Sequence, residues 1–297
     1  MKLVRFGKLG REKPGIIDDE GQIRDLSTKL KDIDGKTINP NSLKLVQRVN
    51  MKKLNVVKGK PRLGVPISNI GKIVCIGLNY VDHAKEVGAP LPKEPIMFLK
   101  PTSSLSGPFD EVMLPKGIIP KKGNSASRLV DSKRSDWEVE LGIVIGDKAR
   151  SVSETKAMQC VAGYTIINDV SERAYQLDAA AGQWTRGKGC DTFCPVGPWL
   201  VTKDEVSRPQ NLSIWLKLNG IKMQDGNTKT MVFNIKELVS YVSHYMTLYP
   251  GDIIATGTPP GVGMGMKPPR YLKKGDVMTL GIDGLGEQNQ LVTSWKK

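Results

Sequence analysis

The sequence contains few of the residues that form disulfides or bind transition metals. Its 297 residues include 4 cysteines and 2 histidines. So few cysteines cannot build a disulfide framework in a chain of this size, and we expect free thiols. Cys190 and Cys194 are closely spaced, but no second pair of Cys or His residues completes a zinc site.

Long apolar segments are also absent from the sequence. No run approaches the roughly 18 apolar residues that a membrane-spanning helix needs. The opening residues, MKLVRFGKLG, lack the apolar stretch of a signal peptide. A hydrophobic content of 39% is that of a globular protein. We therefore expect a cytoplasmic protein with no membrane partner.

The net charge of +14 is the one extreme bulk property. Such an excess can indicate nucleic-acid binding, or a basic surface that attracts small anionic substrates. The lysines are dispersed, aromatic residues make up only 6% of the chain, and no groove-reading motif or stacking platform is visible. The pattern favours the second interpretation, with nucleic-acid binding as the alternative.

Short apolar segments separated by turn residues dominate the chain, and longer strands begin near residue 69. The pattern predicts a small N-terminal domain over residues 1–68 and a larger domain over 69–297. Helical patterns are fewer and do not alternate regularly with strands. A strand-dominated α+β fold is therefore expected rather than a doubly wound sheet. Residues 116–134 are polar and basic and are expected to form an exposed loop.

Two glutamates raise the first question about function. Glu138 and Glu140 stand two residues apart at the start of the apolar run LGIVIG. Alternation along a strand places both on one face, where two unpaired carboxylates are costly to bury. Asp169 directly follows another apolar strand, YTIIN. Carboxylates without nearby His or Cys suit a hard ion such as Mg²⁺, Mn²⁺ or Ca²⁺. The alternative is a solvent-facing Glu pair and a helix-capping Asp169.

Two glycine-rich stretches carry further candidates. Gly182, Gly187 and Lys188 have the spacing of a phosphate loop, but Gly189 stands where that motif needs a hydroxyl. We reject the nucleotide interpretation and keep Lys188 as a candidate cation. The stretch TGTPPGVGMG lacks the dinucleotide-binding spacing and is expected to be a tight loop that exposes amide N–H groups and the Thr258 hydroxyl.

The sequence GLNYVDHAKEVG places His83 and Glu86 three residues apart. One helical turn would bring them together, and a carboxylate beside an imidazole can orient it as a general base. The alternative is a surface helix with an inactive histidine. His244 has no such partner and is expected to be structural.

Taken together, these stretches resemble the fumarylacetoacetate hydrolase family. The similarity covers roughly residues 70–295 and rests on several motifs in order. They are IVCIGLNYVDHAKE, PIMFLKP, DWEVELGIVIG, VAGYTIINDVSER, GKGCDTFCPVGPW and GDIIATGTPPGVG. The resemblance implies a mixed β-roll or barrel-like fold, with residues 1–68 as the small N-terminal domain of bacterial-type members, and a homodimer.

The resemblance also implies roles for individual residues. Glu138, Glu140 and Asp169 match three metal ligands for Mg²⁺ or a similar ion, with no organic cofactor. His83 and Glu86 match a catalytic pair on a mobile lid, and Lys188 matches an active-site lysine. The positions that match substrate contacts are Arg173, Gln176 and Thr258.

The implied reaction is hydrolysis of the C3–C4 bond of a 2,4-dioxo acid, such as an acylpyruvate or a 2,4-dioxo-3-deoxy sugar acid, through a metal-stabilised enolate. Decarboxylation of oxaloacetate, isomerisation and lyase chemistry could use the same site. Two departures stand out: Gly189 and Cys190 follow the lysine, which could loosen the turn that aims Lys188, and the basic loop 116–134 is long.

Overall fold

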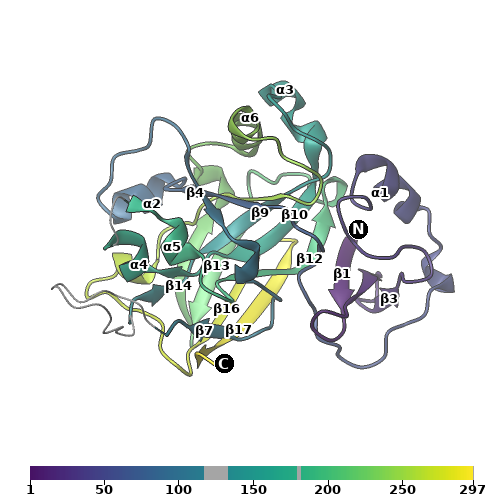
Figure 1. Cartoon of the computed structure of the whole chain (residues 1–297), viewed down its shortest axis with the longest axis horizontal. Helices are drawn as coiled ribbons and strands as arrows, with labels where there is room; N and C mark the ends of the chain where they lie inside the picture. Colours follow the sequence, from purple (N-terminus) through teal and green to yellow (C-terminus); the bar gives the residue numbers. More distant parts are fainter. Residues whose placement is uncertain (117–132, 179–181, 297) are drawn as a thin grey trace, which may run out of the picture.

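Strands form the centre of the protein in the computed structural model, which describes residues 1–116, 133–178 and 182–296. Figure 1 shows α6 and α3 at the top, α2, α4 and α5 together on the left, and α1 with the first strands on the right. The strand-dominated α+β architecture confirms the predicted fold class. Residues 117–132 of the predicted basic loop lie outside the described residues.

The larger sheet has ten strands and mixes parallel and antiparallel pairs. Its path runs through β3 (Ile23–Asp25), β2 (Lys13–Ile17), β1 (Lys2–Phe6), β12 (Cys194–Thr202), β10 (Val161–Asn168), β9 (Val139–Ile145), β15 (Ile253–Ala255), β4 (Ile73–Gly77) and β5 (Ile96–Lys100), and β6 (Leu105–Ser106) pairs with β12.

A second sheet of five strands packs on the first. Its order is β14 (Ile221–Asn227), β13 (Ser213–Leu218), β16 (Val277–Ile282), β17 (Gly286–Ser294) and β7 (Val112–Leu114), and a short ladder joins β8 (Ser135–Asp136) to β11 (Ser171–Glu172). Both large sheets are open at their edges within the described strands, so the barrel-like closure implied by the resemblance is not present there.

The helices are short and lie at the periphery (Figure 1). They are α1 (Pro40–Gln47), α2 (Val81–Glu86), α3 (Glu154–Ala157), α4 (Arg173–Leu177), α5 (Thr185–Lys188) and α6 (Ile235–Tyr245). The described residues also form the 3₁₀ turns η1 (Met51–Lys53), η2 (Thr102–Ser104), η3 (Met158–Cys160), η5 (Lys203–Glu205), η6 (Thr228–Thr230) and η7 (Gly263–Gly265). No described helix is long and apolar enough to cross a membrane.

Strand β9 is buried on both faces and divides the core in two. Leu141, Ile143 and Ile145 point into the cluster between the sheets, together with residues of β13 and β16. Val144 points the other way, into a second cluster that includes residues of α1 and β4. Because Glu140 has the parity of Val144, it lies on the face turned away from the second sheet.

The first residues of the chain share the large sheet with the rest of the protein. Strand β1 pairs antiparallel with β12, with Lys2 opposite Val201 and Leu3 opposite Leu200. The large sheet is therefore continuous across residue 68. The division of the chain into two domains at that residue stays a prediction.

Candidate active site

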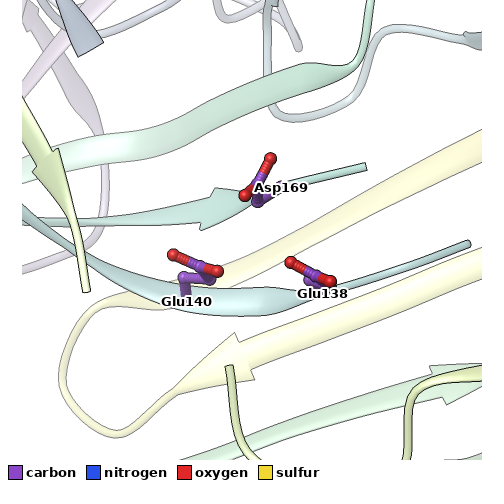
Figure 2. A group of neighbouring side chains, drawn as sticks. All are labelled: Glu138, Glu140 and Asp169. Atoms are coloured by element: carbon purple, nitrogen blue, oxygen red, sulfur yellow. The ribbon is translucent and has the colours of Figure 1, made fainter. Parts of the chain in front are cut away.

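Three carboxylates meet where β9 begins and β10 ends. Strand alternation turns Glu138 and Glu140 to one face, as the sequence predicts. The antiparallel register pairs Glu140 with Ile167, which brings Asp169 level with Glu138, and the Asp169 N–H donates to the Glu138 carbonyl at 2.8 Å. One carboxylate oxygen from each side chain lies within 4.8 Å of the others, and all three residues are buried (Figure 2).

Two buried lysines neutralise part of this charge. The Lys188 Nζ lies 2.6 Å from Glu138 Oε2 and 2.8 Å from Asp169 Oδ2. The Lys100 Nζ lies 2.6 Å from the other oxygen of Asp169 and donates to the Val170 carbonyl at 3.1 Å. Lys188 is therefore in the predicted cluster, at the end of the single-turn helix α5. Lys100, the last residue of β5, is an addition that the sequence analysis missed.

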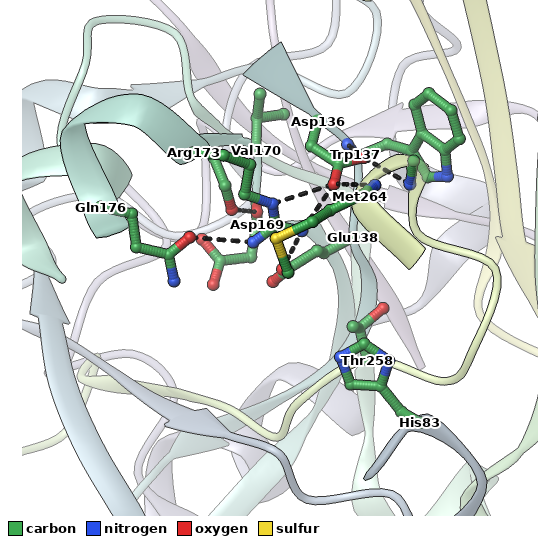
Figure 3. A network of polar contacts seen from close by, with 12 residues as sticks. His83, Asp136, Trp137, Glu138, Asp169, Val170, Arg173, Gln176, Thr258 and Met264 are labelled. Atoms are coloured by element: carbon green, nitrogen blue, oxygen red, sulfur yellow. Dashed lines mark hydrogen bonds and ion pairs between the residues drawn. The ribbon is translucent and has the colours of Figure 1, made fainter. Parts of the chain in front are cut away.

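Arg173 and Gln176 extend the cluster from helix α4, as Figure 3 shows. The Arg173 guanidinium contacts Glu138 Oε1 at 2.7 Å and Asp136 Oδ2 at 2.8 Å, and it donates to the Gln176 side-chain oxygen at 3.0 Å. Asp136 also accepts the amide N–H groups of Gly263 and Met264. This aspartate, which the sequence analysis did not single out, ties Arg173 to the glycine-rich loop.

The surroundings of Glu138 and Glu140 shift the pKa values of the two carboxyl groups in opposite directions. Burial opposes ionisation of Glu138, but the attraction of Lys188 and Arg173 prevails and lowers its pKa to about 2. For Glu140 the outcome is the opposite. Burial disfavours its charged form, and repulsion by Asp169 and Glu138 adds to this effect, so that its pKa lies well above the usual value. Its carboxylate accepts the Gly257 N–H at 2.9 Å and, within the described residues, forms no ion pair with a lysine or arginine.

His83 and Glu86 form the predicted pair on helix α2. The His83 Nδ1 lies 2.8 Å from Glu86 Oε2, and the other Glu86 oxygen accepts the Gly261 N–H at 2.7 Å. Because the carboxylate accepts, Nδ1 carries the proton of the neutral ring and Nε2 is left as an acceptor. His244 is exposed and contacts the Ser240 carbonyl within its own helix, and its structural role stays a prediction.

The glycine-rich loop after β15 holds carboxylates rather than exposing free amides. Its N–H groups donate to Glu140, Glu86 and Asp136. Gly261 has a φ of 103°, and a side chain there would come within 1.9 Å of the Met223 carbonyl oxygen, so only glycine fits. Thr258 donates to the Val139 carbonyl and accepts from Gln224, a buried residue that the sequence analysis missed.

Several of these side chains line one cavity of about 190 Å³. In Figure 3, His83 and Thr258 lie across the drawn network from Gln176, with Arg173 and Glu138 between them. The predicted residues that line the cavity are His83, Glu138, Glu140, Arg173, Gln176, Lys188 and Thr258. Glu86 and Asp169 lie behind this wall and contact His83 and Lys188.

The donor set fits a hard divalent cation. All three candidate ligands are carboxylates, and no histidine or cysteine belongs to the described group. The two lysines and Arg173 pair with Glu138 and Asp169, whereas Glu140 lacks a cationic partner there. A cation between the three side chains would supply the charge that Glu140 lacks, which answers why two like charges stand together on β9.

A buried acidic triad, buried cations and a histidine–carboxylate pair gather at one small cavity, as the groups of an enzyme active site do. The sequence model "Fumarylacetoacetate (FAA) hydrolase C-terminal" matches residues 72–293, and the chain belongs to this family of hydrolases.

Relatives with assigned names support the same class. The 2,4-didehydro-3-deoxy-L-rhamnonate hydrolase of Sphingomonas sp. (strain SKA58) is 55% identical over 297 residues, which cover 100% of this chain and 97% of that protein. The fumarylacetoacetate hydrolase of Exiguobacterium antarcticum has a similar structure, with a TM-score of 0.82 and 33% identity over 99% of this chain and 100% of that one.

A further solved structure contains ligands. Maleylpyruvate hydrolase from Sphingobium sp. SYK-6, in complex with manganese(II) and pyruvate, has a TM-score of 0.79. It is 31% identical, and the match covers 100% of both chains. The similarity therefore extends over the whole chain, including the first 68 residues.

Proposed function

We propose that this protein hydrolyses the C3–C4 bond of a 2,4-dioxo acid, either an acylpyruvate or a 2,4-dioxo-3-deoxy sugar acid. The observation that carries the proposal is that Glu138 and Glu140 of the acidic triad and His83 of the His83–Glu86 pair line the same cavity. One relative is named for a substrate of this kind. The pyruvate in another relative's structure is the kind of product that such a cleavage releases.

Glu138, Glu140 and Asp169 would hold the metal ion. We assign Mg²⁺, with Mn²⁺ or Ca²⁺ as ions of the same preference for oxygen ligands, and no organic cofactor. The manganese in a related structure supports a divalent ion in this family. When bound, the ion supplies Lewis-acid polarisation of the 2-oxo group.

The residues of the chain supply binding and proton transfer. Arg173, Gln176 and Thr258 line the cavity where the 2-oxo acid would bind. The Nε2 of His83, oriented by Glu86, takes a proton from a water molecule that attacks the C4 carbonyl. The C3–C4 bond then breaks, and its electron pair passes to C3 as an enolate.

Lys188 completes the proposed chemistry. Its ammonium group lies at the carboxylate cluster and offsets the negative charge that develops on the enolate oxygen. Protonation of C3 gives a pyruvate-type acid, and the C4 fragment leaves as a second carboxylic acid. The atoms of one water molecule are divided between the two products.

The setting of the enzyme follows the family resemblance. We assign a homodimer of cytoplasmic chains, each with a small N-terminal domain over residues 1–68, with a small anionic 2-oxo acid as the partner. Size-exclusion chromatography with light scattering tests the dimer directly: a mass near twice 32.6 kDa is expected.

The first experiment is turnover of acetylpyruvate by metal-stripped protein, with and without Mg²⁺ or Mn²⁺. Metal-dependent formation of pyruvate and acetate is the expected result. Metal-dependent loss of CO₂ from oxaloacetate, without acetylpyruvate cleavage, would move the assignment to a decarboxylase. Tight nucleic-acid binding that weakens steeply with salt, without turnover, would favour the nucleic-acid-binding alternative.

A further inference from the structure

The cavity that the predicted polar residues line is also lined by apolar side chains. Those that line it are Leu78, Val87, Phe98, Leu177, Trp184 and Met264. The volume of about 190 Å³ is small, so a bound substrate must contact this wall. Where the substrate continues past C4, its chemistry is therefore set by the apolar wall.

The polar and apolar parts of the cavity lining meet where Lys188 lies beside Phe98. The Lys188 Nζ lies 5.2 Å from the centre of the Phe98 ring, and the Phe98 ring packs edge-on against Trp184 at 5.4 Å. Trp184 in turn packs on Gly77, where an added side chain would come within 2.3 Å of the indole. The aromatic wall thus starts directly beside the last cation of the cluster and is fixed in place.

The cations of the cavity are already engaged. Within residues 1–116, 133–178 and 182–296, Lys188 and Arg173 are the only lysine or arginine side chains that line it. Lys188 pairs with Glu138 and Asp169, and Arg173 pairs with Asp136 and Glu138. A carboxylate placed beyond C4 would lose its hydration without gaining a partner, which is costly.

The formal charge of the cluster leads to the same limit. Its ionisable members are Asp136, Glu138, Glu140, Asp169, Lys100, Lys188 and Arg173. In this group four carboxylates face three cations, so none of the three cations is left over to pair with a second substrate carboxylate.

We propose that this cavity selects 2-oxo acids with a single carboxylate and an uncharged, largely apolar group beyond C4, and rejects dicarboxylates. The inference rests on the proposed function for its reaction and on the apolar wall for its selectivity. It distinguishes this chain from enzymes whose substrates carry a second acid at the far end.

The test uses two substrates that differ at one group. The compounds are 2,4-dioxoheptanoate and 2,4-dioxoheptanedioate, which carry a methyl group or a carboxylate at C7. With metal-replete protein, we expect kcat/KM to be about 100-fold or more higher for the monoacid, as the cost of an unpaired, desolvated charge implies. Equal values, or a preference for the diacid, would overturn the inference.

A pair of variants locates the selectivity in the wall. Leu177 lines the cavity at the end of α4 and is 44% exposed, so a charge there keeps its solvent contact. Leu177→Lys is expected to raise kcat/KM for the diacid about three- to fivefold, the effect of a partly exposed ion pair. Leu177→Met has a similar length and no charge, so it serves as the reference variant: kcat/KM for the diacid should be higher in Leu177→Lys than in Leu177→Met. An equal response of the two variants would show that the wall does not select by charge.

A binding measurement separates this inference from the proposed reaction. 2-Oxoheptanoate and 2-oxoheptanedioate lack the C4 carbonyl and cannot undergo the cleavage. Calorimetry with the metal-replete protein should show tighter binding of the monoacid even if neither dioxo acid is hydrolysed, in which case the proposed function fails and the selectivity stands. Equal or tighter binding of the diacid would overturn the selectivity alone.

Discussion

The carboxylate cluster and the His83–Glu86 pair face one cavity but are built in different ways. The cluster lies at the ends of two central strands, where buried lysines hold Glu138 and Asp169 through several ion pairs. The histidine pair lies on a single short helix and is joined to the glycine loop by the bond between Glu86 and the Gly261 amide.

The carboxylate cluster and the histidine pair thus show two ways in which a fold positions reactive groups. The cluster depends on contacts between residues far apart in the chain, so it forms only when the sheet is complete. The pair is local, because positions i and i+3 meet on any helical turn. Breaking the cluster should therefore affect metal binding, stability and activity together, whereas breaking the pair should affect activity alone.

Replacing Glu140 is expected to have the largest effect. Glu140→Gln keeps the shape and the contact with Gly257 but removes one of the three proposed ligand charges. We expect turnover to fall about 1,000-fold or more, with a parallel loss of Mg²⁺ or Mn²⁺ affinity by calorimetry. Glu20→Gln, at an exposed site, is the matched control. An active Glu140→Gln variant that binds metal normally would refute the triad assignment.

Replacing Lys100 removes an ion pair of the cluster at a residue that does not line the cavity. Lys100→Met leaves the buried Asp169 with only Lys188 as a partner, and we expect a loss of about 3–5 kcal/mol in the free energy of unfolding. Lys222→Met breaks an exposed pair with Asp225 and should cost less than about 1 kcal/mol. Urea denaturation of the metal-free proteins measures both, and similar losses would contradict the structural role of Lys100.

Replacing His83 tests the local half of the site. His83→Gln is expected to lower kcat about 100-fold, as the loss of a general base does, while metal affinity stays unchanged. His244→Gln changes the other histidine of the chain, which is exposed and has no carboxylate partner, and its kcat should equal that of the wild type. A loss of metal binding in His83→Gln would show that the two halves are not independent.

The smallest expected effect concerns the stability of the metal-free protein. Burial and repulsion by Asp169 and Glu138 raise the pKa of Glu140, so the folded state binds its proton more tightly than the unfolded chain. Stability therefore falls as pH rises above the usual carboxyl range and through the raised pKa.

Glu140→Gln removes that dependence. At neutral pH the metal-free variant should be about 1 kcal/mol more stable than the wild type, and the difference should disappear near pH 4. Urea denaturation at the two pH values checks this. A variant less stable than the wild type at neutral pH would show that Glu140 is not under repulsion.

The pattern of the sequence predicted parts of the site that depend on local geometry. Strand alternation placed Glu138 and Glu140 on one face, and helical spacing joined His83 to Glu86. The meeting of Asp169 with Glu138 depends on the register of β9 and β10, which no local pattern contains. For that contact the family resemblance supplied what alternation could not.

Residues that act through long-range contacts were missed for a physical reason. Lys100 ends an apolar strand just before a proline, and Gln224 lies in a strand whose neighbours are mostly exposed. Their side chains are nonetheless almost completely buried. A lysine that ends an apolar run has a possible signal, since burying an unpaired ammonium group is costly. Gln224 offers none, because a glutamine on a surface strand is ordinary.

The position of Lys188 sets how the protein responds to the supply of metal ions. Its ammonium group already bridges Glu138 and Asp169, so these side chains are held in place before any ion arrives. If the three carboxylates hold an ion as proposed, the Lys188 ion pairs let the site assemble without it, so the ion would act on activity rather than on folding.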